Sequence, residues 1–169
     1  MTEYQVKLDY VINCYSSTRV NKCKPLIRCV LRLGVYQILY MERVPDEAAC
    51  DECVKLTKKK GFQNLSGFVN GILRSVARNK DTIAFPTEQE DRNAYLSIAY
   101  SMPQWIVERM LEWYGIKKTE KILQASLETP DITVRVNTAK IAKEELVKKL
   151  KDDNIEVTDG YYVPEAVSY

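Results

Sequence analysis

The segment LRLGVYQILY, residues 31–40, is the middle of a helix that we predict over residues 22–41. Apolar side chains cover most of the circumference of that helix, which is typical of a central helix buried on all sides. Gly34 lies inside it, where glycine costs about 1 kcal/mol relative to alanine. A close crossing of another helix at Gly34 would account for this glycine, so we expect a helical bundle built around residues 22–41.

Further helices are predicted on both sides of this segment, because apolar residues recur there at three- and four-residue spacing. Residues suited to capping precede several of them, including Asn21, Asp46 and the capping box of residues 87–90. Ser101-Met102-Pro103 is expected to cap another helix, and Gly115 to end it. The expected helices span residues 2–15, 22–41, 47–60, 65–79, about 87–99, 101–114 and 117–127.

The pattern changes after residue 131. Apolar and polar residues alternate over residues 132–136, which predicts a strand with one buried face. An amphipathic helix over residues 141–152 follows, and then two short candidate strands at residues 155–157 and 161–163. The order strand, helix, strand suggests the start of a small α/β unit with parallel pairing, which we expect to be left incomplete at Tyr169.

The expected fold class is therefore mainly α, with helices followed by the start of a small βαβ unit. We predict a helical domain over residues 1–97, and linking helices with an incomplete α/β subdomain over residues 98–169. No apolar run approaches the roughly 20 residues that a bilayer crossing needs. The first residues also lack the basic and apolar regions of a signal peptide, so we expect a cytoplasmic protein that does not bind membranes.

Charge is distributed unevenly along the chain. Residues 1–80 contain 14 Lys or Arg and 7 Asp or Glu, a net charge of +7, whereas residues 81–169 have a net charge of −5. A basic first half can attract a polyanion such as RNA, although such an excess can also be only a solvated surface. The lysine run has a structural reason too, since a helix C-terminus favours cations. The candidate RNA-binding residues are Lys58, Lys59, Lys60, Arg74, Arg78 and Arg135.

Cys50 and Cys53 form a C-x-x-C, which on a helix places both sulfurs on one face. This spacing is half of a zinc site, but structural zinc usually takes four Cys or His ligands and the chain has no histidine. We interpret the pair as core residues and expect no metal. All five cysteines are expected to be reduced thiols.

The usual signatures of catalysis are missing from the sequence. The six glycines are not clustered into a nucleotide-binding turn, and the absence of histidine removes the commonest general base. Adjacent acids such as Asp51-Glu52 point in different directions on a helix and are interpreted as solvated. We therefore assign no catalytic, cofactor-binding or metal-binding residue.

Three segments resemble the helical, RNA-associated domain named for the transcription antitermination factor NusB. They are LRLGVYQILY at residues 31–40, AACDECVKL at residues 48–56 following Pro45, and GFVNGILR at residues 67–74. The resemblance implies that these helices pack into one domain. Glu52 and Asn70 match polar positions of the family pattern, and family usage implies that they stabilise the fold rather than catalyse a reaction.

The sequence after residue 74 extends the resemblance over nearly the whole chain. Ser101-Met102-Pro103-Gln104-Trp105, Tyr114-Gly115 and the segment TVRVNT at residues 133–138 look like the region that follows the NusB-like domain in the RsmB/Sun family. Members of that family are S-adenosylmethionine-dependent enzymes that methylate C5 of a cytosine in 16S rRNA. Their opening helices should precede residue 1, and their cofactor loop and nucleophilic cysteine motif should follow residue 169.

The resemblance implies that this chain recognises and positions RNA for such an enzyme. Its partners would be 16S rRNA and the catalytic domain of the same protein, and S-adenosylmethionine would bind that domain and not this chain. No cysteine present here lies in a matching nucleophile motif. Two alternatives stay open, namely a module that binds other proteins and a stand-alone antitermination factor of the NusB type.

Overall fold

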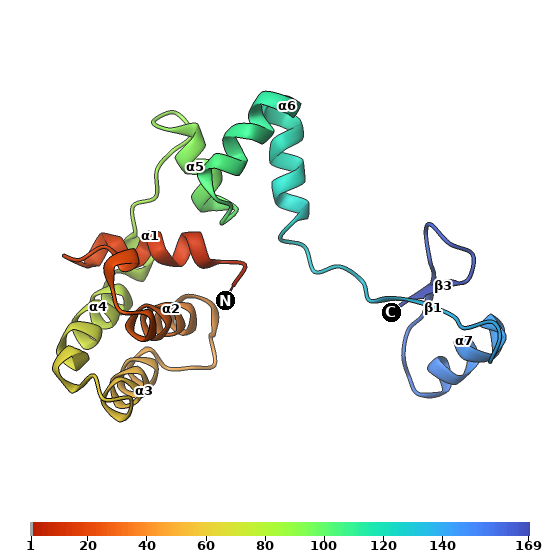
Figure 1. The fold of residues 1–169 in the computed structure, drawn as a ribbon, viewed down its shortest axis with the longest axis horizontal. Helices are drawn as coiled ribbons and strands as arrows, with labels where there is room; N and C mark the ends of the chain where they lie inside the picture. Colours follow the sequence, from red (N-terminus) through yellow and green to blue (C-terminus); the bar gives the residue numbers. More distant parts are fainter. Residues whose placement is uncertain (1) are drawn as a thin grey trace. The chain divides into compact units, whose positions relative to one another are not determined.

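The computed structural model describes residues 2–169 and shows two compact units, a helical one ending at Leu127 and a smaller one over Glu128–Tyr169 (Figure 1). The protein is mainly α-helical, as expected. None of the described helices is long and apolar enough to cross a membrane. The domain boundary predicted at residue 97 stays a prediction. The helices of the first unit are α1 (Gln5–Tyr15), α2 (Pro25–Tyr40), α3 (Asp46–Lys59), α4 (Ser66–Asn79), α5 (Arg92–Ala99) and α6 (Gln104–Ala125).

Helix α2 is the centre of the first unit and contacts α1, α3 and α4. Its central position confirms the prediction, but the expected burial on all sides is wrong, because the buried positions recur every three or four residues and form one face of the helix. Leu33, on another face, is 37% exposed. A methyl group on Gly34 would lie 2.7 Å from both side-chain methyls of Leu73 and 3.1 Å from the Cys53 sulfur. The close crossing predicted at Gly34 is therefore confirmed, and it involves two helices, α3 and α4.

Two of the predicted helix caps are wrong. Asn21 lies in a short 3-10 helix, Val20–Lys22, and α2 begins only at Pro25. Lys24 has an extended backbone because a residue before proline is kept out of the helical region, so the helix cannot start earlier. Asp46 is the first residue of α3 rather than its cap, and its carboxylate instead accepts a 2.8 Å hydrogen bond from Lys80.

The start of α5 also differs from the prediction. Glu90 accepts hydrogen bonds from the backbone and hydroxyl of Thr87, at 3.0 and 2.8 Å, as in a capping box. The helix nevertheless begins at Arg92, because Asp91 caps it by accepting a 3.0 Å hydrogen bond from the Ala94 amide. The capping-box residues therefore form a separate turn ahead of the helix.

Ser101 caps a helix other than the one predicted. Its hydroxyl accepts hydrogen bonds from the amides of Val6 and Lys7, at 3.1 and 3.3 Å, in the first turn of α1. Helix α1 has no side-chain cap of its own, so this residue from the α5–α6 linker satisfies its free amides. Helix α6 follows directly, and Gly115 breaks it with a φ of 67°, as the sequence predicted.

The second unit contains β1 (Thr133–Arg135), α7 (Lys143–Asp152), β2 (Thr158–Asp159) and β3 (Ala166–Ser168). The strand order is β1-β3-β2, and β3 is antiparallel to both neighbours, with Val134 opposite Val167. The predicted parallel pairing is wrong, because β3 inserts between the two strands that flank α7. This arrangement is a split βαβ unit.

The strands predicted at residues 155–157 and 161–163 are also wrong. The amide of Ile155 donates a 2.9 Å hydrogen bond to the Leu150 carbonyl, and Asn154 has a φ of 61°. Together they close the end of α7, so this backbone is not free to pair as a strand. Tyr161 and Tyr162 are each 91% exposed and lie in the bend between β2 and β3.

Candidate functional site

Lys58, Lys59 and Lys60 lie at the end of α3 and are exposed. Gly61 follows with a φ of 81°, which ends the helix. None of the three lysines forms an ion pair with another residue in the described part of the chain. Their ammonium groups interact favourably with the negative end of the α3 dipole, and they are also available to bind an anion.

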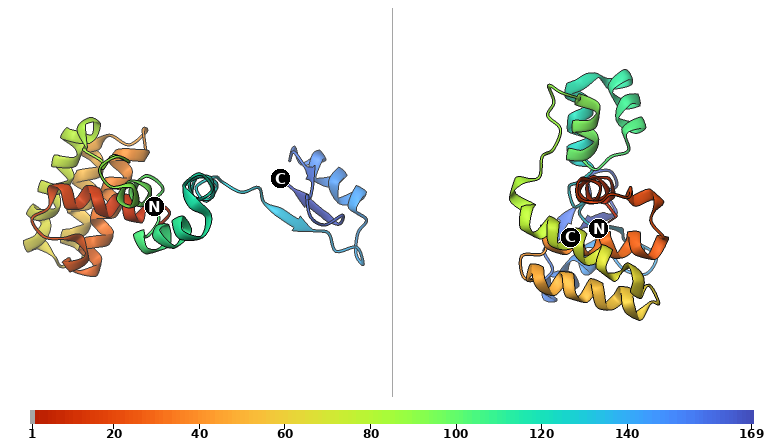
Figure 2. Two further views of the ribbon diagram at one scale, coloured as in Figure 1. Left: turned by 90° about the horizontal axis from the view of Figure 1, so that it is seen from above. Right: turned by 90° about the vertical axis from the view of Figure 1, so that its left-hand side faces the viewer.

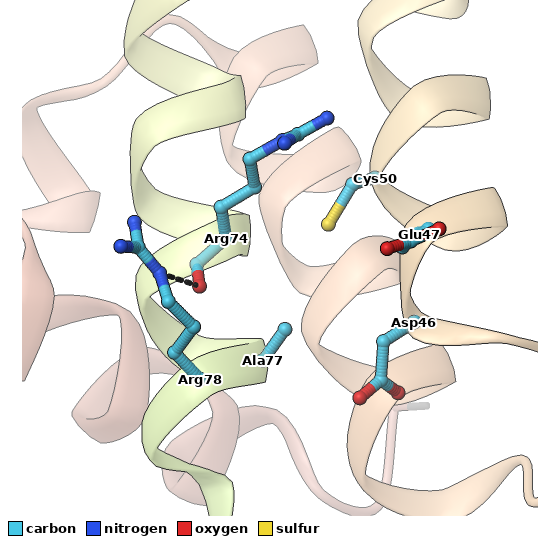
Figure 3. A pocket seen from close by; sticks show the side chains of 6 residues that line it. All are labelled: Asp46, Glu47, Cys50, Arg74, Ala77 and Arg78. Carbon is cyan, nitrogen blue, oxygen red and sulfur yellow. Dashed lines mark hydrogen bonds between the residues drawn. The ribbon is translucent and has the colours of Figure 1, made fainter.

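Arg74 and Arg78 lie one turn apart on α4 and face a different environment. They line a pocket of about 490 Å³ together with Cys50, Ala77 and the carboxylates of Asp46 and Glu47. Figure 3 shows these carboxylates on α3, across the pocket from the two arginines. The pocket therefore carries both signs of charge and is a poor site for RNA phosphates.

Local contacts also hold both arginines. Arg74 lies 3.8 Å from the Asp51 carboxylate and donates a 3.1 Å hydrogen bond to Asn70. Arg78 donates through Nε to the Arg74 carbonyl at 3.2 Å (Figure 3). Glu52 accepts a 2.7 Å hydrogen bond from Lys55. The stabilising roles of Asn70 and Glu52 stay predictions, and an exposed ion pair such as that of Glu52 with Lys55 contributes little to stability.

The five predicted residues of the helical unit do not form one site. Helices α3 and α4 are antiparallel, so Lys58–Lys60 lie where α4 begins, while Arg74 and Arg78 lie towards its other end (Figure 2). Arg135 is exposed on β1 of the second unit. That unit, residues 128–169, contains 6 Lys or Arg and 9 Asp or Glu, so Arg135 belongs to an acidic part of the chain.

The structure adds a neighbour to the lysine run that the sequence analysis missed. The ammonium nitrogen of Lys24 lies 5.1 Å from the centre of the Phe62 ring, just beyond the end of α3. Lys24 belongs to the linker between α1 and α2, which also carries the exposed residues Arg19 and Lys22. The signal was visible in the sequence, because residues 10–41 contain no Asp or Glu.

Cys50 and Cys53 lie in the core among α2, α3 and α4. Burial raises the pKa of Cys50 and raises that of Cys53 to about 11, so both thiols stay protonated near neutral pH. The Cys53 thiol donates to the Val30 carbonyl at a distance of 3.7 Å. Over residues 2–169, no three His, Cys, Asp or Glu side chains are grouped to hold a metal ion. Both side chains belong to the main hydrophobic core of the helical unit.

Two families match separate parts of the chain. Residues 1–78 match the NusB family, and residues 102–168 match the ferredoxin-like domain of RsmF/B-like methyltransferases. The probable ribosomal RNA small subunit methyltransferase B of Bacillus subtilis is 34% identical over 163 residues, which is 96% of this chain and 36% of that protein. The corresponding protein of Synechocystis is 29% identical over the same shares.

Two further comparisons concern the NusB match and the fold. The transcription antitermination protein NusB of a Nocardioides species is 36% identical over 85 residues, half of this chain and 63% of that protein. The crystal structure of PH0851 superposes with a TM-score of 0.74 at 20% identity, covering 97% of this chain and 37% of that one. The chain thus spans about a third of the methyltransferase relatives that it matches.

Proposed function

The chain belongs to the ribosomal RNA small subunit methyltransferase B family, and we propose that it is the part of such an enzyme that recognises and positions RNA. The observation that carries this proposal is the match over 96% of the chain to a protein of that name. The parent enzyme would methylate C5 of a cytosine in 16S rRNA in the cytoplasm. Its catalytic domain would be the intramolecular partner of this chain.

The parent enzyme would take its methyl group from S-adenosylmethionine, but the residues of this chain do not fit that cofactor. Nucleotide-type cofactors bind at a glycine-rich turn following a strand of a parallel sheet. The sheet of the second unit is antiparallel at both of its pairings, and the pockets of the described residues contain no glycine-rich turn. We therefore assign the cofactor to the catalytic domain and no methyl-transfer step to this chain.

The charge of the helical unit supports a role in RNA binding. Lysines that meet no carboxylate in the described residues can replace the counterions of phosphates, and the release of those ions drives association. Such contacts position the RNA but do not read its sequence. Selectivity would then come from the shape of the RNA and from unpaired bases.

A titration of the 169-residue chain with a fluorescent small-subunit rRNA hairpin tests this proposal. We expect log K to fall with log salt concentration with a slope of about −3 to −5, as four to six phosphate contacts would give. A slope near zero, or no binding at the ionic strength of a cell, would contradict the proposal. A DNA duplex with the hairpin's stem sequence controls for charge alone, and it should bind more weakly.

A second function is favoured by one observation on α6. Trp105 and Trp113 are 68% and 67% exposed, and Tyr114 next to them is 45% exposed. Exposed aromatic side chains of this size are typical of surfaces that bind another protein. The segment of the Bacillus subtilis relative that follows the matched region, expressed separately, should then bind this chain. A stand-alone antitermination factor is less favoured, because residues 102–168 match the ferredoxin-like domain of RsmF/B-like methyltransferases.

A further inference from the structure

Two segments of the helical unit lack carboxylates entirely. Residues 10–41 contain five Lys or Arg and no Asp or Glu, and residues 53–80 contain seven Lys or Arg and no Asp or Glu. They are far apart in sequence and are joined through the acidic start of α3. What matters for binding is therefore whether the fold brings their cations together.

The fold brings one part of each segment to the same end of the helical unit. Helix α2 begins there at Pro25, α3 ends there at Lys59, and Lys24 contacts the ring of Phe62 at 5.1 Å. In the right-hand view of Figure 2, the linker after α1 and the turn between α3 and α4 lie at the same end. We call this surface the basic end, and it consists of Arg19, Lys22, Lys24, Lys58, Lys59 and Lys60.

The cations of the basic end are free, whereas several others of this unit are paired. All six are exposed, and none forms an ion pair with a residue that the structure describes. By contrast, Arg32 is held by Asp9 at 2.6 Å and Lys80 by Asp46 at 2.8 Å. Six exposed cations without an ion pair to a described residue thus lie where the two acid-free segments meet.

Helix stability does not explain the linker cations. Lys58 and Lys59 lie in the last turn of α3, where the helix dipole favours them. Lys24 directly precedes the first residue of α2, where the dipole favours an acid and opposes a cation. No acid lies in the first turn of α2. The dipole of α2 therefore gives no reason for a lysine at this position, where its ammonium group contacts the Phe62 ring.

We propose that the basic end is the surface of this chain that binds the phosphate backbone of RNA. This inference rests on the proposed function and deepens it, because it selects one surface among the predicted residues. It adds the linker residues Arg19, Lys22 and Lys24 to the lysine run. It leaves out Arg74 and Arg78, because they line a pocket that also contains the carboxylates of Asp46 and Glu47. The six groups are mobile point charges or guanidinium groups in solvent, which suits a flexible single strand or a hairpin loop.

Two charge-removing variants of the 169-residue chain test the inference with the labelled rRNA hairpin. The first combines Arg19→Gln, Lys22→Gln and Lys24→Gln. The second combines Lys58→Gln, Lys59→Gln and Lys60→Gln. The matched control, Lys148→Gln, Lys149→Gln, Lys151→Gln, removes three exposed lysines from α7. Each basic-end variant should bind at least about 10-fold more weakly at 0.1 M salt, with a salt slope about 2 units shallower. The control should bind within about 2-fold of the unmodified chain.

The outcomes separate this inference from the proposed function. If the unmodified chain binds the hairpin but both basic-end variants bind as it does, the inference fails and the proposed function stands. A variant Arg74→Gln, Arg78→Gln that loses more affinity than either triple variant would also overturn the inference. If the unmodified chain binds no RNA, both fail. If poly-glutamate displaces the hairpin at equal charge concentration, the basic end binds an acidic protein and the inference fails. Thermal unfolding of each variant checks that its fold is intact.

Discussion

At the scale of single residues, Gly34 determines how closely three helices approach one another. Its missing side chain is the space into which Leu73 and Cys53 pack. The sequence predicted this crossing because glycine destabilises the interior of a helix, and a close helix crossing accounts for its presence. The partners could not be predicted, since the pattern within one helix does not say which side chains of other helices meet it.

Gly34→Ala should lower the free energy of unfolding by about 1–3 kcal/mol, because the added methyl group overpacks a filled core. Urea unfolding monitored by circular dichroism measures the change. Gly71→Ala is the matched control, since a methyl group there meets no atom within 4 Å and α4 should gain up to about 1 kcal/mol in helix propensity. Equal shifts in the two variants would contradict the packing account of Gly34.

The cysteines should divide by burial in their reaction with a thiol reagent. Cys14 and Cys29 are exposed and should be modified quickly at pH 8, whereas Cys50 and Cys53 should react only on unfolding. Because the folded pKa of Cys53 is raised to about 11, its contribution to stability is complete at neutral pH. That contribution is lost as pH rises from about 9 to 11, where the unfolded thiol ionises first. Mass spectrometry of alkylated peptides measures the rates, and fast modification of Cys53 in the folded protein would contradict its placement.

At the scale of elements, the helices could be predicted closely and their caps could not. The apolar spacing of α2, α3 and α4 is a local property, so it locates these helices from sequence alone. A helix cap also depends on residues that the fold brings close to the end of the helix. Ser101 caps α1 from 95 residues away, and Pro25 keeps Asn21 out of α2. The strands near the C-terminus were misplaced for a similar reason, because insertion of β3 is a long-range event.

Ser101→Ala should cost about 0.5–2 kcal/mol of stability, because the amides of Val6 and Lys7 lose their acceptor. Hydrogen exchange of the α1 amides should speed up in this variant. Ser126→Ala is a suitable control, since the Ser126 hydroxyl only donates to the Leu123 carbonyl three residues earlier. If α1 exchanges no faster in Ser101→Ala than in the control, this long-range cap does not stabilise the helix.

At the scale of the whole molecule, the chain joins a basic helical unit to an acidic α/β unit. The sequence predicted the charge difference and the change of structural class correctly. It also placed Lys58–Lys60 in the candidate site. It could not separate them from Arg74 and Arg78, because the carboxylates that share a pocket with those arginines come close to them only when α3 and α4 pack together. The linker cations around Lys24 were missed because no single element contains them.

The helical unit should fold and bind RNA without the second unit. Its two core clusters contain no residue beyond position 127. A chain truncated after Leu127 should therefore keep a cooperative thermal transition within about 4 °C of the complete chain. Its affinity for the rRNA hairpin should stay within about 3-fold at matched salt. Loss of the transition, or of binding by a folded truncated chain, would show that the acidic unit contributes to the site.

The most direct test of RNA binding by the basic end is lysine protection, with acetylation rates measured by mass spectrometry with and without the rRNA hairpin. Bound phosphates should slow the acetylation of Lys22, Lys24 and the run Lys58–Lys60, while Lys148, Lys149 and Lys151 of α7 react at unchanged rates. Equal rates at the basic end in the two samples, at an RNA concentration that saturates the protein, would contradict the account.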